Sequence, residues 1–144
     1  MVITSPSFKD GEFIPKKFSC SGGDINPELQ IQNVPPEAKS LALIMDDPDA
    51  TRGVMFTHWL LWNIDPQTAV IKEESVPSGA VEGMNDFGRI GYGGPCPPRG
   101  NKPHHYHFKL YALRVMLSLK LGADKKSLES EINKYLVNEA MVVG

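Results

Sequence analysis

The sequence predicts a mainly β fold, a two-sheet antiparallel β-sandwich with a peripheral helix near the C-terminus. Three observations support this. Short segments of strand character recur along the 144 residues, separated by turns that use many of the 13 glycines and 12 prolines. Two of these segments are nearly continuous apolar runs, as expected for strands covered on both faces. One late segment has apolar residues at helical spacing, which places a single helix outside the sheets.

Length and composition exclude several classes of protein. A chain of this length can bury a core of its own, so we expect a single domain over residues 1–144. The formal net charge of −2 gives no electrostatic case for binding nucleic acid. No window holds the ~18 consecutive apolar residues that a membrane helix needs, and the N-terminus lacks the basic and then apolar layout of a signal peptide. We therefore expect a cytoplasmic protein without membrane insertion.

The cysteine content fits the same compartment. Cys20 and Cys96 are too few for a disulfide framework. We expect them to be two small thiols, buried or half-buried, in a reducing cytosol.

Two apolar runs form the centre of the predicted fold. Residues 40–47 (SLALIMDD) read as a central strand that stops at Pro48 with two acids at its end. Residues 57–64 (THWLLWNI) form a second such run, with His58 near its start. Both predicted strands therefore carry ionisable groups at one end of an apolar core.

Shorter elements flank these runs. The Asp-Gly pair at 10–11 lies between apolar residues and predicts a β-hairpin within residues 5–20. Residues 29–34 alternate as a strand, residues 66–77 form a linking segment of no clear type, and Val81 begins another short strand.

A tract rich in Gly and Pro leads into a further strand. Residues 83–103 cannot pair as a central strand, because prolines give up their N–H donors and fix their own φ, so we expect a stiff loop. Residues 104–113 then alternate cleanly. One face of this predicted strand carries His104, Tyr106, Phe108, Leu110 and Ala112. The polar residues His104 and Tyr106 thus precede the apolar residues on this face and lie at the rim of the core, where pockets form.

The last elements are a helix and a strand. Residues 124–138 have apolar residues on one helical face, and Asp124 is a suitable N-cap. Residues 141–143 are a candidate final strand.

Four polar residues fall in an apolar setting, namely Asp47, His58, His104 and Tyr106. Ionisable groups are costly to bury unless they satisfy one another or a ligand. A carboxylate beside an imidazole raises the pKa of the imidazole, so two histidines near neutral pH can offer N–H donors to an anion. Asp47 would hold one ring in the right tautomer. The residues predict a small pocket suited to phosphate, sulfate or carboxylate.

Other interpretations of these residues stay open. His58 alone in an apolar strand is more often a core histidine. The run from His104 to His107 could hold a metal, yet His104 and His105 point to opposite faces of a strand. Cys96 near His104 could be a nucleophile, but its flanking prolines leave no helix N-terminus to lower the pKa of its thiol. We therefore expect no metal, no cofactor and no catalytic residue.

Two regions of the chain resemble the signatures of the phosphatidylethanolamine-binding protein family, also called Raf-kinase-inhibitor-like, and most closely its short bacterial and archaeal branch. The first is residues 46–50 (DDPDA) followed by His58-Trp59. The second is residues 91–100 (GYGGPCPPRG) followed by His104 and Tyr106. Further matches extend over nearly the whole chain. One departure is Thr51, which stands where the family's acidic motif has Pro.

The resemblance implies a two-sheet antiparallel sandwich with a small anion pocket that serves as a ligand-binding site. Carried over residue by residue, its ligand-binding positions are Asp47, Asp49, His58, Pro98, His104 and Tyr106, with Gly94 and Pro97 as wall. The resemblance also implies a cis peptide bond near the pocket.

Members of this family bind phospholipid headgroups, inhibit kinases or serine proteases, and act as signalling scaffolds. We expect a non-catalytic cytosolic protein that binds a phosphate-like or other anionic group and regulates a partner such as a kinase or protease. One alternative is a serine protease inhibitor that acts through a surface loop such as Thr51–Phe56. Another is an enzyme acting on a phosphoester or ester, with His58 or His104 as acid–base and Asp47 as orienter. A homodimer stays open, because short relatives often pair.

Overall fold

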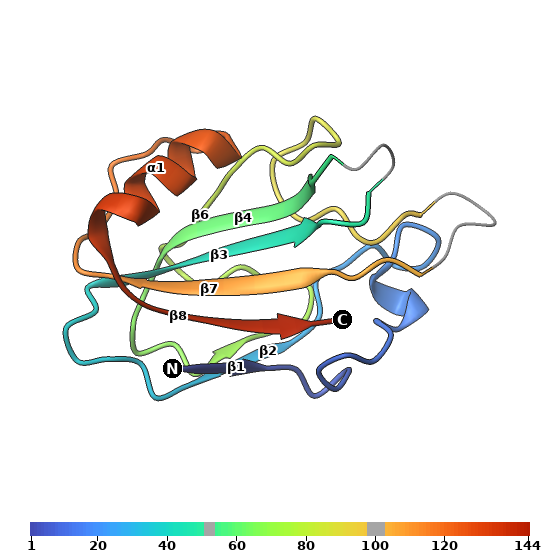
Figure 1. The fold of residues 1–144 in the computed structure, drawn as a ribbon, viewed down its shortest axis with the longest axis horizontal. Helices are drawn as coiled ribbons and strands as arrows, with labels where there is room; N and C mark the ends of the chain where they lie inside the picture. Colours follow the sequence, from blue (N-terminus) through green and yellow to red (C-terminus); the bar gives the residue numbers. More distant parts are fainter. Residues whose placement is uncertain (51–53, 98–102) are drawn as a thin grey trace.

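The structure is a computed structural model of the 144-residue chain, and it describes residues 1–50, 54–97 and 103–144. Strands in these residues form two antiparallel sheets (Figure 1). The small sheet has the order β1 (Val2–Thr4), β2 (Leu29–Gln32), β5 (Val70–Ile71). The large sheet has the order β6 (Val81–Glu82), β4 (Phe56–Ile64), β3 (Ser40–Asp47), β7 (His107–Leu113), β8 (Leu136–Val143). The predicted sandwich is therefore confirmed.

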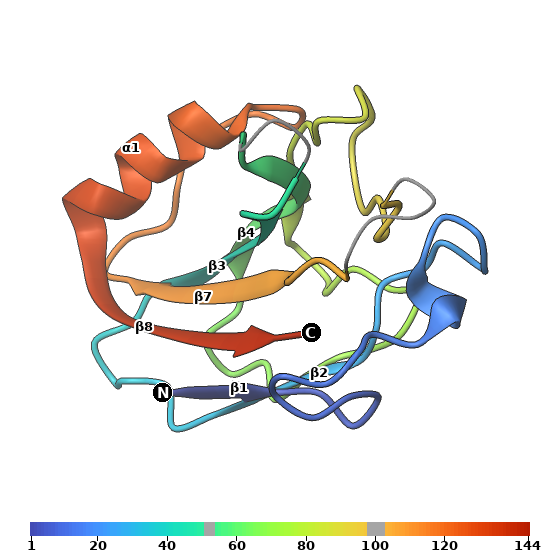
Figure 2. The ribbon, with the colours of Figure 1, turned by 45° about the vertical axis from the view of Figure 1, so that its right-hand side comes forward.

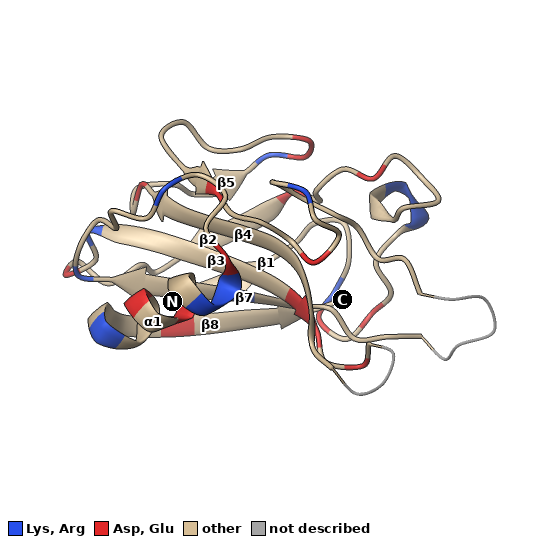
Figure 3. Cartoon of the chain, turned by 90° about the horizontal axis from the view of Figure 1, so that it is seen from above, with Lys and Arg blue, Asp and Glu red and all other residues tan. Residues whose placement is uncertain are grey.

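The helix α1 (Lys125–Tyr135) covers the outer face of the large sheet, so the molecule has three layers (Figure 2). Two apolar clusters fill the spaces between them. The larger lies between the sheets and includes Leu29, Leu43 and Phe108. The smaller lies between the large sheet and α1 and includes Ile44 and Leu128. Charged residues are sparse along the central strands and frequent on α1 and the connecting segments (Figure 3).

Strand β3 has the bounds that the sequence predicts, and every one of its residues is buried. Its odd-numbered residues up to Met45 belong to the cluster between the sheets, and Ala42 and Ile44 belong to the cluster under α1. Because successive side chains alternate across a strand, the two acids at its end leave on opposite faces. Asp46 lies toward α1, and Asp47 lies toward the gap between the sheets.

Strand β4 contains an irregularity at His58. Met45 of β3 pairs with Trp59, but Asp46 pairs with Thr57. One residue of β4, His58, is therefore extra, which is the arrangement of a β-bulge. By strict alternation His58 would share the face of Leu60, which packs under α1. The bulge turns its ring to the other side instead.

The predicted hairpin at Asp10-Gly11 is wrong. A turn does form there, with Gly11 at a φ of 85°. Its hydrogen bonds, however, go to the end of β8: the Gly11 N–H donates to the Val143 carbonyl at 2.8 Å, and the Val143 N–H donates to Asp10 Oδ1 at 2.9 Å. The next regular element is a 3-10 helix, η1 (Lys16–Phe18), rather than a strand.

The C-terminal elements follow the prediction in type and differ in extent. Asp124 is the N-cap of α1 and accepts the Ser127 N–H at 2.8 Å. The helix ends at Tyr135, earlier than residue 138, because Leu136 already pairs with Leu113 of β7. The final strand is consequently eight residues long instead of three.

Candidate functional site

The end of β3 brings two ionisable side chains from distant segments together. Asp47 Oδ2 lies 2.7 Å from His104 Nδ1, and both side chains are almost fully buried. A carboxylate can only accept a hydrogen bond, so His104 Nδ1 carries the proton. The Asp47–His104 pair therefore fixes the tautomer of the ring, as the sequence predicted, and His104 Nε2 has no hydrogen-bond partner among the described residues.

His58 is held in the same way by backbone. Its Nδ1 lies 2.7 Å from the Gly93 carbonyl oxygen, and its own carbonyl accepts the Gly93 N–H at 3.0 Å. A carbonyl is an acceptor, so Nδ1 must donate here as well, and within the described part of the chain Nε2 has no hydrogen-bond partner. The bulge and this pairing together set the direction of the ring.

These side chains line one cavity of about 580 Å³. Its polar lining is Asp47, His58, Asp86, His104 and Tyr106. Its apolar lining is Ala50, Val54, Met55, Phe56, Phe87, Cys96 and Pro97. We call this cavity the pocket. It has a polar floor at the ends of β3 and β4 and a largely apolar, aromatic rim.

Tyr106 contributes a buried hydroxyl group to the pocket. Its hydroxyl is buried and has no hydrogen-bond partner among the described residues. Burial raises the pKa of this phenol, so it stays protonated and can donate a hydrogen bond. Buried hydroxyls are normally paired, which makes an acceptor atom of a ligand the natural partner for Tyr106.

Burial acts on His58 in the opposite direction to the one we expected. The buried setting lowers the pKa of His58, and this outweighs the Gly93 hydrogen bond and the charge of Asp47, which raise it. The expectation that a neighbouring carboxylate makes both histidines cationic near neutral pH is therefore wrong for His58. At neutral pH, His58 Nε2 is therefore an acceptor.

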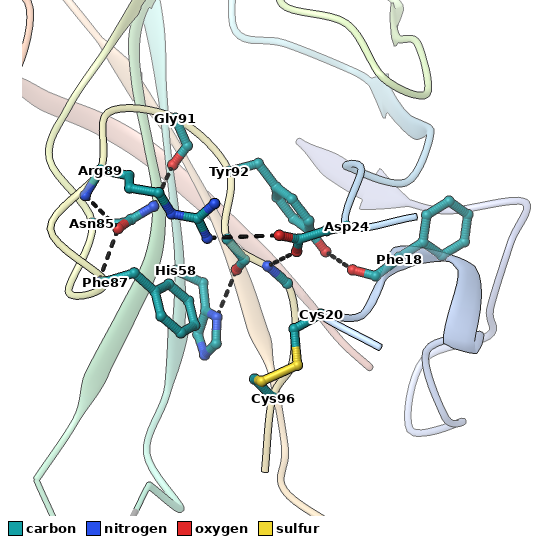
Figure 4. A network of polar contacts seen from close by, with 12 residues as sticks. Phe18, Cys20, Asp24, His58, Asn85, Phe87, Arg89, Gly91, Tyr92 and Cys96 are labelled. Atoms are coloured by element: carbon teal, nitrogen blue, oxygen red, sulfur yellow. Dashed lines mark hydrogen bonds and ion pairs between the residues drawn. A yellow bond between two sulfur atoms is a disulfide. The ribbon is translucent and has the colours of Figure 1, made fainter. Parts of the chain in front are cut away.

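The segment Gly93–Pro97, which we call the wall segment, closes one side of the pocket. Figure 4 shows how polar contacts hold it against the N-terminal part of the chain. The Gly94 N–H donates to Asp24 Oδ1 at 2.8 Å. The Cys20 N–H donates to the Pro95 carbonyl at 3.0 Å. Upstream, the Tyr92 hydroxyl donates to the Phe18 carbonyl at 2.9 Å.

Cys20 and Cys96 form a disulfide, with their Cα atoms 5.3 Å apart (Figure 4). The prediction of two free thiols is wrong, because the fold brings together two residues separated by 76 positions. A sulfur in a disulfide is not a thiolate, so Cys96 is not available as a nucleophile in this form.

One of the positions that the family resemblance assigned to ligand binding lies outside the pocket. Asp49 does not line the pocket; its Oδ2 lies 2.6 Å from His105 Nδ1, on an exposed pair. Hydrogen bonds from His105 hold the pKa of the Asp49 carboxyl below its usual value. Gly94 is a buried part of the wall segment, and Pro97 lines the pocket. Pro98 and residues 51–53 of the predicted inhibitory loop lie outside the described residues.

Sequence reasoning missed the aromatic side of the pocket. Phe56 and Phe87 pack edge to face at 4.7 Å between ring centroids, and both rings lie against His58. Asp86 also lines the pocket, where its Oδ2 accepts the Thr57 N–H at 2.7 Å. Phe87 and Asp86 sit in the Gly/Pro tract, whose irregular backbone carries no periodicity from which a direction could be inferred.

The described residues contain no group of three or more His, Cys, Asp or Glu side chains placed to hold a metal ion. Nor do they include a helix with the length and apolar character to span a membrane. Their peptide bonds are all trans.

Residues 4–144 match the family profile described as "Phosphatidylethanolamine-binding protein". The chain belongs to the phosphatidylethanolamine-binding protein family. Within this family it is 49% identical to a UPF0098 protein of Pyrococcus horikoshii, over 97% of this chain and 73% of that protein. It is 48% identical to a UPF0098 protein of Aquifex aeolicus, over 100% of this chain and 86% of that one.

Solved structures of the family agree with the fold. A homologue from Chlamydia trachomatis superposes with a TM-score of 0.93 at 39% identity, covering 99% of this chain and 94% of that chain. YbcL of E. coli, described as a member of the mammalian family, superposes with a TM-score of 0.91 at 33% identity, covering 98% and 94%. The resemblance seen in the motifs is thus confirmed over the whole sandwich.

Proposed function

We propose that the protein is a non-catalytic binding module whose pocket takes a small anionic group, such as a phosphate or a phosphorylated headgroup, and that occupancy regulates a partner protein in the cytoplasm. Membership of the phosphatidylethanolamine-binding protein family supports an anion pocket in general terms. The nature of the anion and of the partner is our proposal.

The observation that carries the proposal is the buried, unpartnered hydroxyl of Tyr106 in a pocket with two imidazoles. In both rings Nδ1 forms a hydrogen bond within the protein, from His104 to Asp47 and from His58 to Gly93. Nε2 has no such partner among the described residues. A tetrahedral oxyanion has several oxygens, and it can accept from the phenol O–H and, once a ring takes up a second proton, from its Nε2–H. The phenol and the two rings around one ligand would give such a group its orientation.

Binding of an anion would be coupled to a proton. Because burial lowers the pKa of His58, its ring is neutral at pH 7 and its Nε2 has a lone pair. An anion therefore binds best when His58 takes up a proton, or when the ligand itself supplies one as a P–OH group. Asp47 and Asp86 also line the pocket, and their charge disfavours an anion until an imidazolium offsets it.

Calorimetric titration with phosphoethanolamine and phosphoserine, at two pH values, tests the proposal. The informative variant is His104→Asn, since the Asn amide can still donate to Asp47 while the position of Nε2 is lost. We expect the affinity to fall about 10- to 100-fold. His105→Ala is the matched control, because His105 is exposed and pairs with Asp49 outside the pocket. Native protein that binds neither ligand would reject the proposal.

A second candidate is an acid–base enzyme, and the Asp47–His104 pair is the observation that favours it. An imidazole oriented by a carboxylate at 2.7 Å is the arrangement of a general base. A panel of phosphoesters and carboxylic esters would separate the two functions. Turnover by the native protein that disappears in both His58→Ala and His104→Asn would establish the enzyme.

A further inference from the structure

The Cys20–Cys96 disulfide lies on the surface rather than in the core. Both half-cystines are exposed. The bond joins segments 76 residues apart, one leading out of η1 and the other inside the wall segment. Exposed disulfides are the ones that solution thiols can reach and that serve as labile or regulatory bonds, whereas structural ones are usually protected.

The same disulfide borders two hollows of the surface. Cys96 lines the pocket. Both cysteines line a second hollow of about 640 Å³, which we call the outer groove, together with Lys16, Ser19 and Ser21. His104 and Tyr106 border both hollows. A molecule in the outer groove would therefore lie beside the disulfide and beside two polar residues of the pocket.

The disulfide is one of the main contacts that hold the wall segment against the rest of the chain. Its first half is held by the two Gly93–His58 hydrogen bonds and by the bond from Gly94 to Asp24. Its second half, Pro95 to Pro97, is held within the described residues by one backbone hydrogen bond, from Cys20 to Pro95, and by the disulfide. Breaking the disulfide would release the half that carries the pocket-lining Cys96 and Pro97.

We propose that Cys20–Cys96 is a redox modification site that controls the pocket: the oxidised form is preorganised for its anion, and reduction by a dithiol weakens binding. A thiolate of the dithiol attacks one sulfur, forms a mixed disulfide and releases the other cysteine as a thiolate. The second thiol of the reductant then displaces the first cysteine. The protein gains two electrons and two protons, and the dithiol leaves as its own disulfide.

This inference rests on the proposed anion site, and it gives a physical role to an exposed disulfide in the proposed cytoplasmic setting. Cytosolic disulfides are usually transient or redox-sensing, because thiol systems there keep cysteines reduced. The pocket would then be weak in the reducing state and strong after oxidation. Since coupling between two sites is reciprocal, a bound anion must also make the disulfide harder to reduce by the same factor.

Two measurements on the native protein test the proposal. The first is titration with phosphoethanolamine before and after reduction by dithiothreitol, for which we expect on the order of tenfold weaker binding in the reduced form. The second is the midpoint of reduction in graded ratios of reduced to oxidised dithiothreitol, with thiols counted by alkylation. Saturating phosphoethanolamine should shift this midpoint by the same tenfold ratio, about 30 mV for a two-electron couple.

The double variant Cys20→Ser/Cys96→Ser is the matched control. It should bind like the reduced native protein, and dithiothreitol should leave its affinity unchanged. A disulfide that stays intact in excess dithiothreitol without denaturant overturns the proposal, and so does equal affinity in the two redox forms.

Absence of binding in both redox forms would instead reject the proposed anion site. Amide hydrogen exchange of Cys20, whose N–H donates to the Pro95 carbonyl, then decides the redox part by itself. Faster exchange of this amide after reduction supports release of the second half of the wall segment, and unchanged exchange overturns it.

Discussion

At the scale of single residues, the pocket depends on the hydrogen bonds that determine which imidazole nitrogen of His58 and His104 is left for a ligand. The Asp47 carboxylate and the Gly93 carbonyl each bind an Nδ1 and leave an Nε2 for the ligand. The phenol of Tyr106 adds a donor that has no acceptor among the described residues. A small number of acceptor atoms thus decides what the pocket offers.

The pH dependence of binding follows from His58. Burial holds its pKa below the ordinary value, and a bound anion would raise this pKa, so affinity should be highest at low pH and fall as pH rises between the two pKa values. Inorganic sulfate is the suitable probe, because the second pKa of a phosphate ester lies near 6 and would add its own pH dependence. His58→Gln, which cannot become cationic, should flatten the calorimetric profile; a native profile that is already flat would contradict proton uptake.

Gly94 is predicted to be intolerant of any side chain. A Cβ at this position would overlap the Phe18 carbonyl oxygen and lie 3.0 Å from Ser19 Cα. Both are backbone atoms, so Gly94→Ala should destabilise the protein by about 3 kcal/mol or more in urea unfolding. Gly88→Ala is the comparison: it has open space and only the strain of a positive φ, about 1 kcal/mol. Equal losses in the two variants would contradict the steric argument.

The sequence predicted the polar floor of the pocket and misplaced its edge. Asp47, His104 and Tyr106 lie on strands or their extensions, where alternation indicates direction. Asp49 follows a proline that ends β3, and there alternation no longer applies, so its pairing with His105 could not be foreseen. Asp86 was missed for the same reason, since it comes from irregular backbone.

At the scale of elements, Asp46 links the large sheet to the helix. Its buried Oδ2 accepts from Lys109 of β7 at 3.1 Å and from Lys125 of α1 at 3.2 Å. Lys125 Nζ also lies 3.1 Å from Met55 Sδ at the rim of the pocket. One buried carboxylate therefore connects three parts of the structure.

A double-mutant cycle on the two lysines should be strongly non-additive. Lys109→Met and Lys125→Met each leave one cation on Asp46, so each should cost about 1 kcal/mol. The double variant leaves a buried charge without a cation and should cost about 3–5 kcal/mol. Urea unfolding measures all three. Asp46→Asn in the double variant should recover part of the loss, and simple additivity would contradict the shared ion pair.

Elements with an unbroken pattern were predictable, and elements shaped by distant partners were not. The bounds of β3 were predicted because its apolar run is flanked by clear signals. The bulge at His58 depends on how β4 pairs with β3, and the absent hairpin at Asp10-Gly11 depends on hydrogen bonds to Val143. Neither partner can be read from the local sequence.

At the scale of the whole molecule, the disulfide closes a long loop of the chain. A link across 76 positions reduces the entropy of the unfolded chain and should stabilise the fold by about 4 kcal/mol. Cys20→Ser/Cys96→Ser should lower the urea midpoint accordingly, with the slope of the transition also changed because the unfolded state becomes more expanded. A midpoint equal to that of the oxidised native protein would contradict this. The pairing itself could not be predicted, since only the packed fold brings the two segments together.

The opposite directions of Asp46 and Asp47 also have a consequence for how the chain finds its fold. All other residues of β3 except Ser40 are apolar and buried on both faces, so burial alone hardly distinguishes the native alignment from one slipped by a residue. A slip one way would present Met45 to the two lysines and Asp46 to His104. A slip the other way would leave His104 facing Pro48. Either error would leave a charged group buried without its partner. The two adjacent acids therefore favour the native alignment of the central strand over the slipped ones.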